Sequence, residues 1–254
     1  MLEYDVCLGI MQYKADAQKL VEGMQAVKEA GFDAVEFFLL QDEDISPILE
    51  AQKRLGLKTA LFIPIRGSLV NPDERQAFLK GLEDGIQKAQ TLNCRRLTLM
   101  AGYLLPDRTR EEQRESLIKG LKAAAPLLEK AGIIGVLEPL NQKDNKGYFV
   151  SYSDEAFRIL DEVGSPNVKL LFDAYHQQIM EGNLIERITN NIDKIGHLHA
   201  AGIPGRHELD TGELNYPNIF RAVKETGYDG YFGLEYRPTK DLLASLKEAR
   251  KICV

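Results

Sequence analysis

Four residues in the C-terminal half of the chain carry side chains that bind divalent cations. They are Glu138, Asp173, His199 and Glu235, and successive members are 35, 26 and 36 residues apart. Each lies at the end of a short apolar run that is typical of a buried strand. These separations match one strand-plus-helix unit, and parallel strands bring their carboxyl ends to one rim. We therefore expect the four side chains to converge.

A converging set of three carboxylates and one imidazole indicates a metal site. Carboxylates in a small cavity repel one another unless a cation or protons compensate their charge. Oxygen-rich ligation with one imidazole suits Mn²⁺ or Mg²⁺ better than structural zinc, while Co²⁺ and Zn²⁺ remain open. A single acidic residue near a strand end can equally cap a helix or lie in a solvated loop. The prediction therefore depends on four candidates occurring in successive units.

All four histidines of the chain lie within 32 positions of one another, from His176 to His207. His197 precedes His199 by two residues, which places it one pleat repeat deeper in the same strand. We interpret His197 as a buried structural histidine rather than a ligand. His207 and Glu208 follow the sequence PGR, and we expect them to be solvated loop residues.

The elements that position these residues alternate along the chain. Eight short apolar, often β-branched runs predict strands at 4–10, 34–40, 58–63, 95–101, 133–140, 168–176, 195–201 and 230–236. The clearest amphipathic helices are predicted at 16–31, 72–92, 111–132 and 215–227. Gly31, Gly132 and Gly227 stand where a left-handed C-terminal cap is expected. Glu36, inside the second run, either lines the pocket or pairs with a neighbouring cation.

This alternation predicts an α/β protein with one (β/α)8 TIM barrel, a single domain over residues 1–254. The competing fold is a doubly wound open sheet. Its dinucleotide-binding form places a glycine-rich turn after the first strand, and GIMQYKAD contains no such turn. The barrel is favoured, with its chemistry at the carboxyl ends of the strands.

Composition limits the partners. The chain has a formal net charge of -6, whereas nucleic-acid binding proteins usually carry a basic surface. Three widely spaced cysteines indicate a reducing compartment without disulfides. The start MLEYDVCLGI lacks the basic region of a signal peptide, and no apolar run is long enough to cross a membrane. We expect a cytoplasmic protein with a small-molecule substrate, no nucleic-acid or membrane partner, and homo-oligomer formation left open.

Several segments resemble the hydroxypyruvate isomerase family of the xylose-isomerase-like barrels. The segments are LEPLN, DAYHQQ, GHLHAAGIPGRHELDTGELNY and GYDGYFGLEYRP. The resemblance implies a metal held by Glu138, Asp173, His199 and Glu235. It also implies that Glu138 and Glu235 act as the acid/base pair.

The same resemblance implies that His176 and Arg206 orient the substrate. Hydroxypyruvate isomerases usually carry Gln where this chain has His199, whereas the related ketose 3-epimerases carry His. Gly202 replaces an Asp that is common in the isomerases, and the loop PIRGSLVNP also departs from the family pattern. These departures bear on the substrate more than on the chemistry.

The function expected from these residues is isomerisation of a small hydroxy-carbonyl compound, hydroxypyruvate or a related 2-oxo acid or sugar. The reaction would pass through a cis-enediolate stabilised by the metal, with the two glutamates transferring the proton. The alternative is a ketose 3-epimerase. A metal-dependent endonuclease is less favoured, because it would need more histidines and a basic groove. A non-catalytic binding barrel is the remaining alternative.

Overall fold

The computed structural model describes residues 2–12, 17–40 and 44–253. Eight strands, each parallel to its neighbours, close into one barrel in chain order, with β8 paired to β1. The strands are β1 (Glu3–Cys7), β2 (Ala34–Leu39), β3 (Lys58–Ile63), β4 (Arg96–Leu99), β5 (Ile134–Leu137), β6 (Val168–Asp173), β7 (Ile195–Ala200) and β8 (Tyr231–Leu234). The predicted (β/α)8 barrel is confirmed, and the open doubly wound sheet is wrong.

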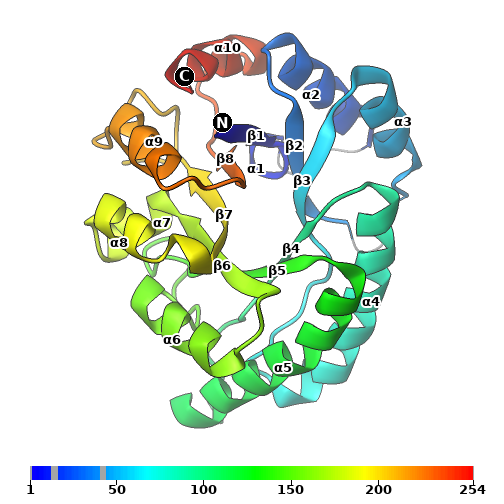
Figure 1. Cartoon of the computed structure of the whole chain (residues 1–254), viewed down its shortest axis with the longest axis vertical. Helices are drawn as coiled ribbons and strands as arrows, with labels where there is room; N and C mark the ends of the chain where they lie inside the picture. The colour runs from blue at the N-terminus through cyan, green and yellow to red at the C-terminus, as the bar shows by residue number, and fades with distance from the viewer. Residues whose placement is uncertain (1, 13–16, 41–43, 254) are drawn as a thin grey trace.

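Helices surround the barrel, as Figure 1 shows. They are α1 (Leu8–Met11), α2 (Ala17–Glu29), α3 (Ser46–Leu55), α4 (Arg75–Thr91), α5 (Arg110–Ala131), α6 (Ser153–Val163), α7 (Ala174–Met180), α8 (Leu184–Asn190), α9 (Tyr216–Glu225) and α10 (Leu242–Ile252), with 3₁₀ turns η1 (Pro72–Glu74) and η2 (Ile192–Lys194). The apolar faces of the helices and strands form the main core between the two layers.

Local sequence explains where the longest helix begins and ends. Thr109 and Glu112 form a reciprocal capping box at the start of α5. Gly132 ends α5 in the left-handed conformation, with φ of 65°, as predicted. Gly31 and Gly227 also have positive φ, just beyond α2 and α9. The first residue of the helix predicted at 16–31 lies outside the described residues.

Two predicted strands are shorter than expected because a helical turn begins at the rim. The run at 4–10 ends as a strand at Cys7, and α1 follows at once. The run at 168–176 ends at Asp173, whose side chain caps α7. The apolar residues beyond each strand are buried in these short helices. Apolar composition alone therefore did not locate the end of either strand.

The barrel interior changes from apolar to polar towards the carboxyl ends of the strands. Leu61, Val136 and Leu171 form a small apolar cluster. Strand pairing then places Asp173 beside His199, and His199 beside Gly233. Residues paired across neighbouring strands share a face of the sheet, so one layer of the interior carries this polar row.

Two further features concern membrane-spanning helices and the reactivity of the cysteines. Within residues 2–12, 17–40 and 44–253, no helix combines the length and apolar character needed to cross a membrane. Cys7, Cys94 and Cys253 are free and buried. Burial raises the pKa of Cys94 and of Cys253 to about 12, so neither thiol ionises readily.

Candidate metal centre and active site

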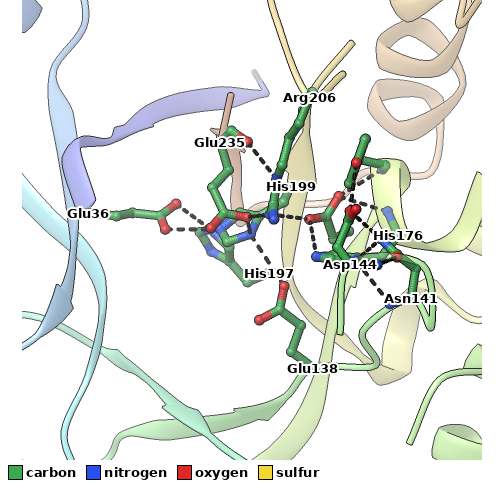
Figure 2. A network of polar contacts seen from close by, with 12 residues as sticks. Glu36, Glu138, Asn141, Asp144, His176, His197, His199, Arg206 and Glu235 are labelled. Atoms are coloured by element: carbon green, nitrogen blue, oxygen red, sulfur yellow. Dashed lines mark hydrogen bonds and ion pairs between the residues drawn. The ribbon is translucent and has the colours of Figure 1, made fainter. Parts of the chain in front are cut away.

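The four predicted ligand residues lie together at the carboxyl rim of the barrel. Figure 2 labels three of them, Glu138, His199 and Glu235. Glu138, Asp173, His199 and Glu235 each offer one ligand atom, and these atoms all lie within 4.8 Å of one another. All four side chains are largely buried. The spacing of the sequence therefore predicted the convergence of these residues.

The register of the barrel explains why the four side chains meet. His199 pairs with Asp173 on one side and with Gly233 on the other. Glu235 stands two residues beyond Gly233 and points into the barrel above it, because side chains alternate along a strand. Glu138 stands two residues beyond the inward-facing Val136 in the same way. Glu138 and Asp173 thus each stand two residues beyond a member of the small apolar cluster, and Glu235 stands two residues beyond the position that pairs with His199.

Asp173 has two roles that use different oxygens. Its Oδ1 accepts hydrogen bonds from the backbone N–H groups of Tyr175 (2.7 Å) and His176 (3.4 Å), which caps α7. Its Oδ2 faces the cluster and accepts a hydrogen bond from Arg206 Nη2 at 3.0 Å. The cap fixes the side-chain rotamer, so Oδ2 is held towards the other ligand atoms.

The His199 ring stands between two groups of carboxylates. Its Nε2 lies 2.9 Å from Glu36 Oε2. Its Nδ1 lies 3.0 Å from Glu235 Oε2 and 3.9 Å from Glu138 Oε1, but it makes no hydrogen bond of acceptable geometry. Nδ1 is thus a buried polar atom without a hydrogen-bond partner, and it faces the ligand oxygens.

Arg206 supplies positive charge to the cluster. Its Nη2 contacts Glu235 Oε2 closely as well as Asp173 Oδ2, and the guanidinium lies 5.0 Å from the centre of the Tyr175 ring. Arg206 has a φ of 60°, a left-handed conformation that costs a non-glycine residue about 1 kcal/mol. Its carbonyl accepts the N–H of Arg237 at 2.7 Å, which holds the loop in place.

The two glutamates differ in their protonation in the absence of a metal. Burial and the charge of Glu235 raise the pKa of Glu138 well above its usual range. Burial also acts to raise the pKa of Glu235, but Arg206 and His199 outweigh it and lower that pKa below its usual range. The surroundings therefore favour the protonated form of Glu138 and the ionised form of Glu235.

The residues present fit a divalent metal. Three carboxylates and one imidazole form an oxygen-rich donor set of the kind that Mn²⁺ and Mg²⁺ accept. The buried Nδ1 of His199 makes no hydrogen bond and faces the ligand oxygens, so it can act as a ligand atom once it carries no proton. When bound, such an ion polarises a substrate carbonyl and stabilises the negative charge that follows proton removal.

Binding of Mn²⁺ to the metal-free protein is expected to release protons and to tighten as the pH rises. Burial lowers the pKa of His199, but Glu36 and Glu235 outweigh it and raise that pKa. With its pKa raised, the metal-free His199 ring holds a second proton, which it must lose for Nδ1 to act as a ligand. Below this pKa the affinity should fall about tenfold per pH unit.

Calorimetric titration in two buffers with different ionisation enthalpies measures the protons released directly. Equal binding enthalpies in the two buffers at pH 6.5 would contradict the protonation described here. Glu213→Gln, which changes an exposed carboxylate on the loop after β7, is the control and should release the same number of protons as the unchanged protein.

His176 is held as a neutral ring beside the cluster. Its Nδ1 accepts the backbone N–H of Asn141 at 3.0 Å, so the ring proton is on Nε2. Nε2 lies 3.5 Å from Asp173 Oδ2. Burial lowers the pKa of His176 to about 4. At neutral pH the ring can therefore donate one hydrogen bond from Nε2.

A cavity of about 480 Å³ opens onto the cluster. Its polar lining comes from Glu138, Asn145, His176, Arg206, Glu235 and Arg237. Its remaining walls are mostly apolar, with Phe38, Ile63 and Met100 among them. The candidate acid/base residues and the candidate substrate contacts thus line one cavity large enough for a small molecule.

His197 and Glu36 form a buried pair below the candidate ligands. His197 is fully buried, as predicted, but only Nε2 has a partner, Glu36 Oε1 at 2.8 Å. Burial lowers the pKa of His197 to about 3. Glu36 does not line the cavity. Of the two interpretations left open for Glu36, pairing is the one that the structure supports, and the partners are the two histidines of β7.

The prediction that His207 and Glu208 are solvated loop residues is wrong for Glu208, which is buried. His207 is partly buried, and its Nδ1 lies 2.9 Å from the carbonyl oxygen of Arg237. Glu208 is 2% exposed and accepts hydrogen bonds from Thr239 N, Thr239 Oγ1 and Ser245 Oγ at 2.9 to 3.0 Å. Both residues bind the loop after β7 to the loop after β8. Sequence reasoning missed this because the partners lie about 30 residues away.

Replacing Glu208 by Ala is expected to lower the free energy of unfolding by about 2–3 kcal/mol, because the buried hydroxyl of Ser245 and two donors of Thr239 lose their acceptor. Burial acts to raise the pKa of Glu208, but the hydrogen bonds from Thr239 and Ser245 outweigh it and lower that pKa. A carboxylate with a lowered pKa contributes stability above its unfolded pKa and loses that contribution as the pH falls through its folded pKa. The difference between the two proteins should therefore shrink in acid.

Urea unfolding at pH 7 and at decreasing pH measures this contribution. Asp210→Ala changes an exposed acidic residue of the same loop and should alter the unfolding free energy by less than about 0.5 kcal/mol. A Glu208→Ala protein as stable as Asp210→Ala at pH 7 would show that these hydrogen bonds contribute nothing net.

Comparison with known proteins places the chain among sugar isomerases and related barrels. Residues 24–252 match the family model described as xylose isomerase-like TIM barrel. The 2-oxo-tetronate isomerase of Cupriavidus necator is 34% identical over 244 residues, which cover 93% of this chain and 93% of that protein. The hydroxypyruvate isomerase of Escherichia coli K12 is 32% identical over 227 residues, covering 86% of this chain and 88% of that protein.

A solved structure extends the similarity to the whole backbone. The crystal structure of a protein from Brucella melitensis, named as an AP endonuclease of family 2, has a TM-score of 0.92 and 31% identity, and the match covers 99% of each chain. The chain therefore belongs to the xylose isomerase-like TIM barrel family, and within it to the group of hydroxypyruvate isomerases. The prediction that the protein is an isomerase is confirmed.

Proposed function

We propose that the protein is a metal-dependent isomerase of a small hydroxy-carbonyl compound, with hydroxypyruvate or a related 2-oxo acid as substrate. The observation that carries this proposal is the cluster of Glu138, Asp173, His199 and Glu235, in which Glu138 and Glu235 line the 480 Å³ cavity. The 2-oxo-tetronate and hydroxypyruvate isomerases among its relatives support the choice of a 2-oxo acid. The ion that the cluster suits best is Mn²⁺ or Mg²⁺.

The proposed proton transfer uses Glu138 and Glu235. Glu235, the ionised carboxylate, removes the proton from the carbon that bears the hydroxyl group. The electron pair of the broken C–H bond forms the C=C bond of an enediolate, and the carbonyl oxygen takes the negative charge. Glu138 in its protonated form then delivers a proton to the former carbonyl carbon. The hydroxyl proton passes to the former carbonyl oxygen, and the hydroxyl oxygen becomes the new carbonyl.

The remaining polar residues of the cavity have proposed roles in orienting the substrate. His176 donates a hydrogen bond from Nε2 to a substrate oxygen, since its Nδ1 is occupied by Asn141. Arg206 is placed within reach of both Asp173 and Glu235, and its planar fork suits a carboxylate. The apolar walls exclude water from the enediolate, which strengthens the electrostatic interactions around it.

Ketose 3-epimerisation is the alternative, and His199 is the feature that favours it, because the residue resembles the ligand of the epimerase branch. In that reaction the two glutamates act on opposite faces of one carbon, so the proton returns to the atom it left.

Endonuclease activity has less support. The net charge of -6 is unfavourable for a duplex, and the candidate centre lies in a cavity of only about 480 Å³.

The test is turnover of the metal-stripped protein on hydroxypyruvate, four-carbon 2-oxo acids and free ketoses, with and without restored Mn²⁺ or Mg²⁺. We expect metal-dependent conversion of a 2-oxo acid. Conversion of ketoses alone would assign the protein to the epimerases. Binding of the metal without turnover of any of these compounds would favour the non-catalytic barrel.

A further inference from the structure

A buried carboxylate stands below the candidate metal centre and contacts two histidines at once. Glu36 Oε1 lies 2.8 Å from His197 Nε2, and Glu36 Oε2 lies 2.9 Å from His199 Nε2 (Figure 2). Glu36 is 1% exposed and both rings are 3% exposed or less. Glu36 comes from β2 and the histidines from β7, so the contact crosses the interior of the barrel.

The neighbouring residues leave this carboxylate little freedom. Both of its oxygens are occupied, so rotation of the carboxylate would break one hydrogen bond. A Cβ atom at Gly233 would lie 2.2 Å from Glu36 Oε1 and 2.8 Å from His199 Cδ2. Glycine at this position is what allows the carboxylate and the ring to approach each other beside β8.

The hydrogen-bond roles follow from the chemistry of the groups. An ionised carboxylate only accepts hydrogen bonds, so both Nε2 atoms must donate. In each neutral ring the Nδ1 atom then carries the lone pair. For His199 this is the atom that faces Glu138 and Glu235 at 3.9 and 3.0 Å. An imidazole lone pair next to carboxylates is unfavourable unless a proton or a metal cation lies between them.

We propose that Glu36 is the positioning residue of the metal centre: it holds the proton of His199 on Nε2 and so presents Nδ1 to the metal. His197 acts as the second donor that keeps Glu36 aligned, and it is not itself a ligand. This inference rests on the proposed function, because it assumes that His199 binds a metal. It adds Glu36 and His197 as residues that act through His199 without touching substrate.

The first test uses the unchanged protein with ¹⁵N-labelled histidine. Long-range ¹H–¹⁵N spectra of the Mg²⁺-loaded protein should show His199 protonated on Nε2 and unprotonated on Nδ1. The opposite tautomer would overturn the proposal. This measurement requires neither a variant nor turnover.

The second test compares the Mn²⁺ affinities of two variants by calorimetry. Glu36→Met removes both acceptors at nearly constant volume, and we expect Mn²⁺ to bind 10- to 100-fold more weakly, as is typical when the partner of a ligating histidine is lost. His197→Phe is the matched control, because it removes the other ring and keeps the bond between Glu36 and His199. It should weaken binding by much less than Glu36→Met.

The outcomes separate this inference from the proposed function. Unchanged Mn²⁺ affinity in a folded Glu36→Met protein, or an equal loss in both variants, would overturn the role of Glu36 alone. Failure of the unchanged protein to bind Mn²⁺ or Mg²⁺ would overturn both proposals. Metal binding and the expected tautomer without turnover of any 2-oxo acid would leave Glu36 in its role and overturn only the proposed function.

Discussion

Replacing Glu138 by Gln is expected to lower kcat by about 10³-fold, within the range typical of a lost general acid or base. The amide has nearly the shape of the carboxyl group, but it has no proton to deliver at neutral pH and is a weaker ligand for the metal. The measurement is kcat at saturating Mn²⁺ on whichever compound the unchanged protein converts. The loss should persist at high metal concentration, since the proton transfer itself is impaired.

Glu213→Gln provides the control for this experiment. Glu213 is exposed on the loop after β7, and its replacement should leave kcat within about twofold of the unchanged protein. A Glu138→Gln protein that keeps more than a tenth of the activity would show that Glu138 is not the acid. Water or another group would then deliver the proton. Metal affinity measured in parallel separates the loss of a ligand from the loss of the proton donor.

Replacing Gly233 by Ala is expected to destabilise the barrel by about 2 kcal/mol, in the range seen for overpacked interiors. The added methyl group would lie 2.2 Å from Glu36 Oε1 and 3.0 Å from Asp5 Oδ1. Both carboxylates are buried, so neither can move into solvent. For a chain of this length the melting temperature should fall by about 4–8 °C.

Gly67→Ala is a milder substitution for comparison. A Cβ atom there meets only the Phe78 side chain, at 3.2 Å and beyond, and the melting temperature should fall by less than in Gly233→Ala. Scanning calorimetry without added metal measures both proteins. Equal melting temperatures for Gly233→Ala and the unchanged protein would show that the row of Asp5, Gly233 and His199 can relax at no cost.

The parts of the site that sequence could predict are those set by the repeat of the fold. Glu138, Asp173, His199 and Glu235 stand at or next to the carboxyl ends of β5, β6, β7 and β8 in turn, and a closed parallel barrel brings such positions to one rim. The spacing of these residues was therefore informative without any knowledge of distances. The same argument located the deeper His197, because alternation along a strand is a local property.

The parts that sequence could not predict depend on contacts between distant segments. Glu36 and His197 are 161 residues apart, and only closure of the barrel brings them together. Glu208 stands in a loop whose polar composition is typical of solvent exposure, yet its acceptors are used by donors that follow β8. In the run at 4–10, the apolar residues of α1 are as buried as those of β1. The run of apolar residues in the sequence therefore did not show where the strand ends and the helix begins.

The reactivity of the three buried cysteines measures where and how often the folded protein opens. A thiol reacts only as an accessible thiolate, so a disulfide reagent will modify Cys7, Cys94 and Cys253 only when the segment around each opens. Cys253 follows α10 directly and is released by fraying of that helix, whereas Cys7 ends β1 between β2 and β8. The order of labelling should therefore distinguish loosening at the end of the chain from breathing of the barrel, and a bound metal should slow the second process more than the first.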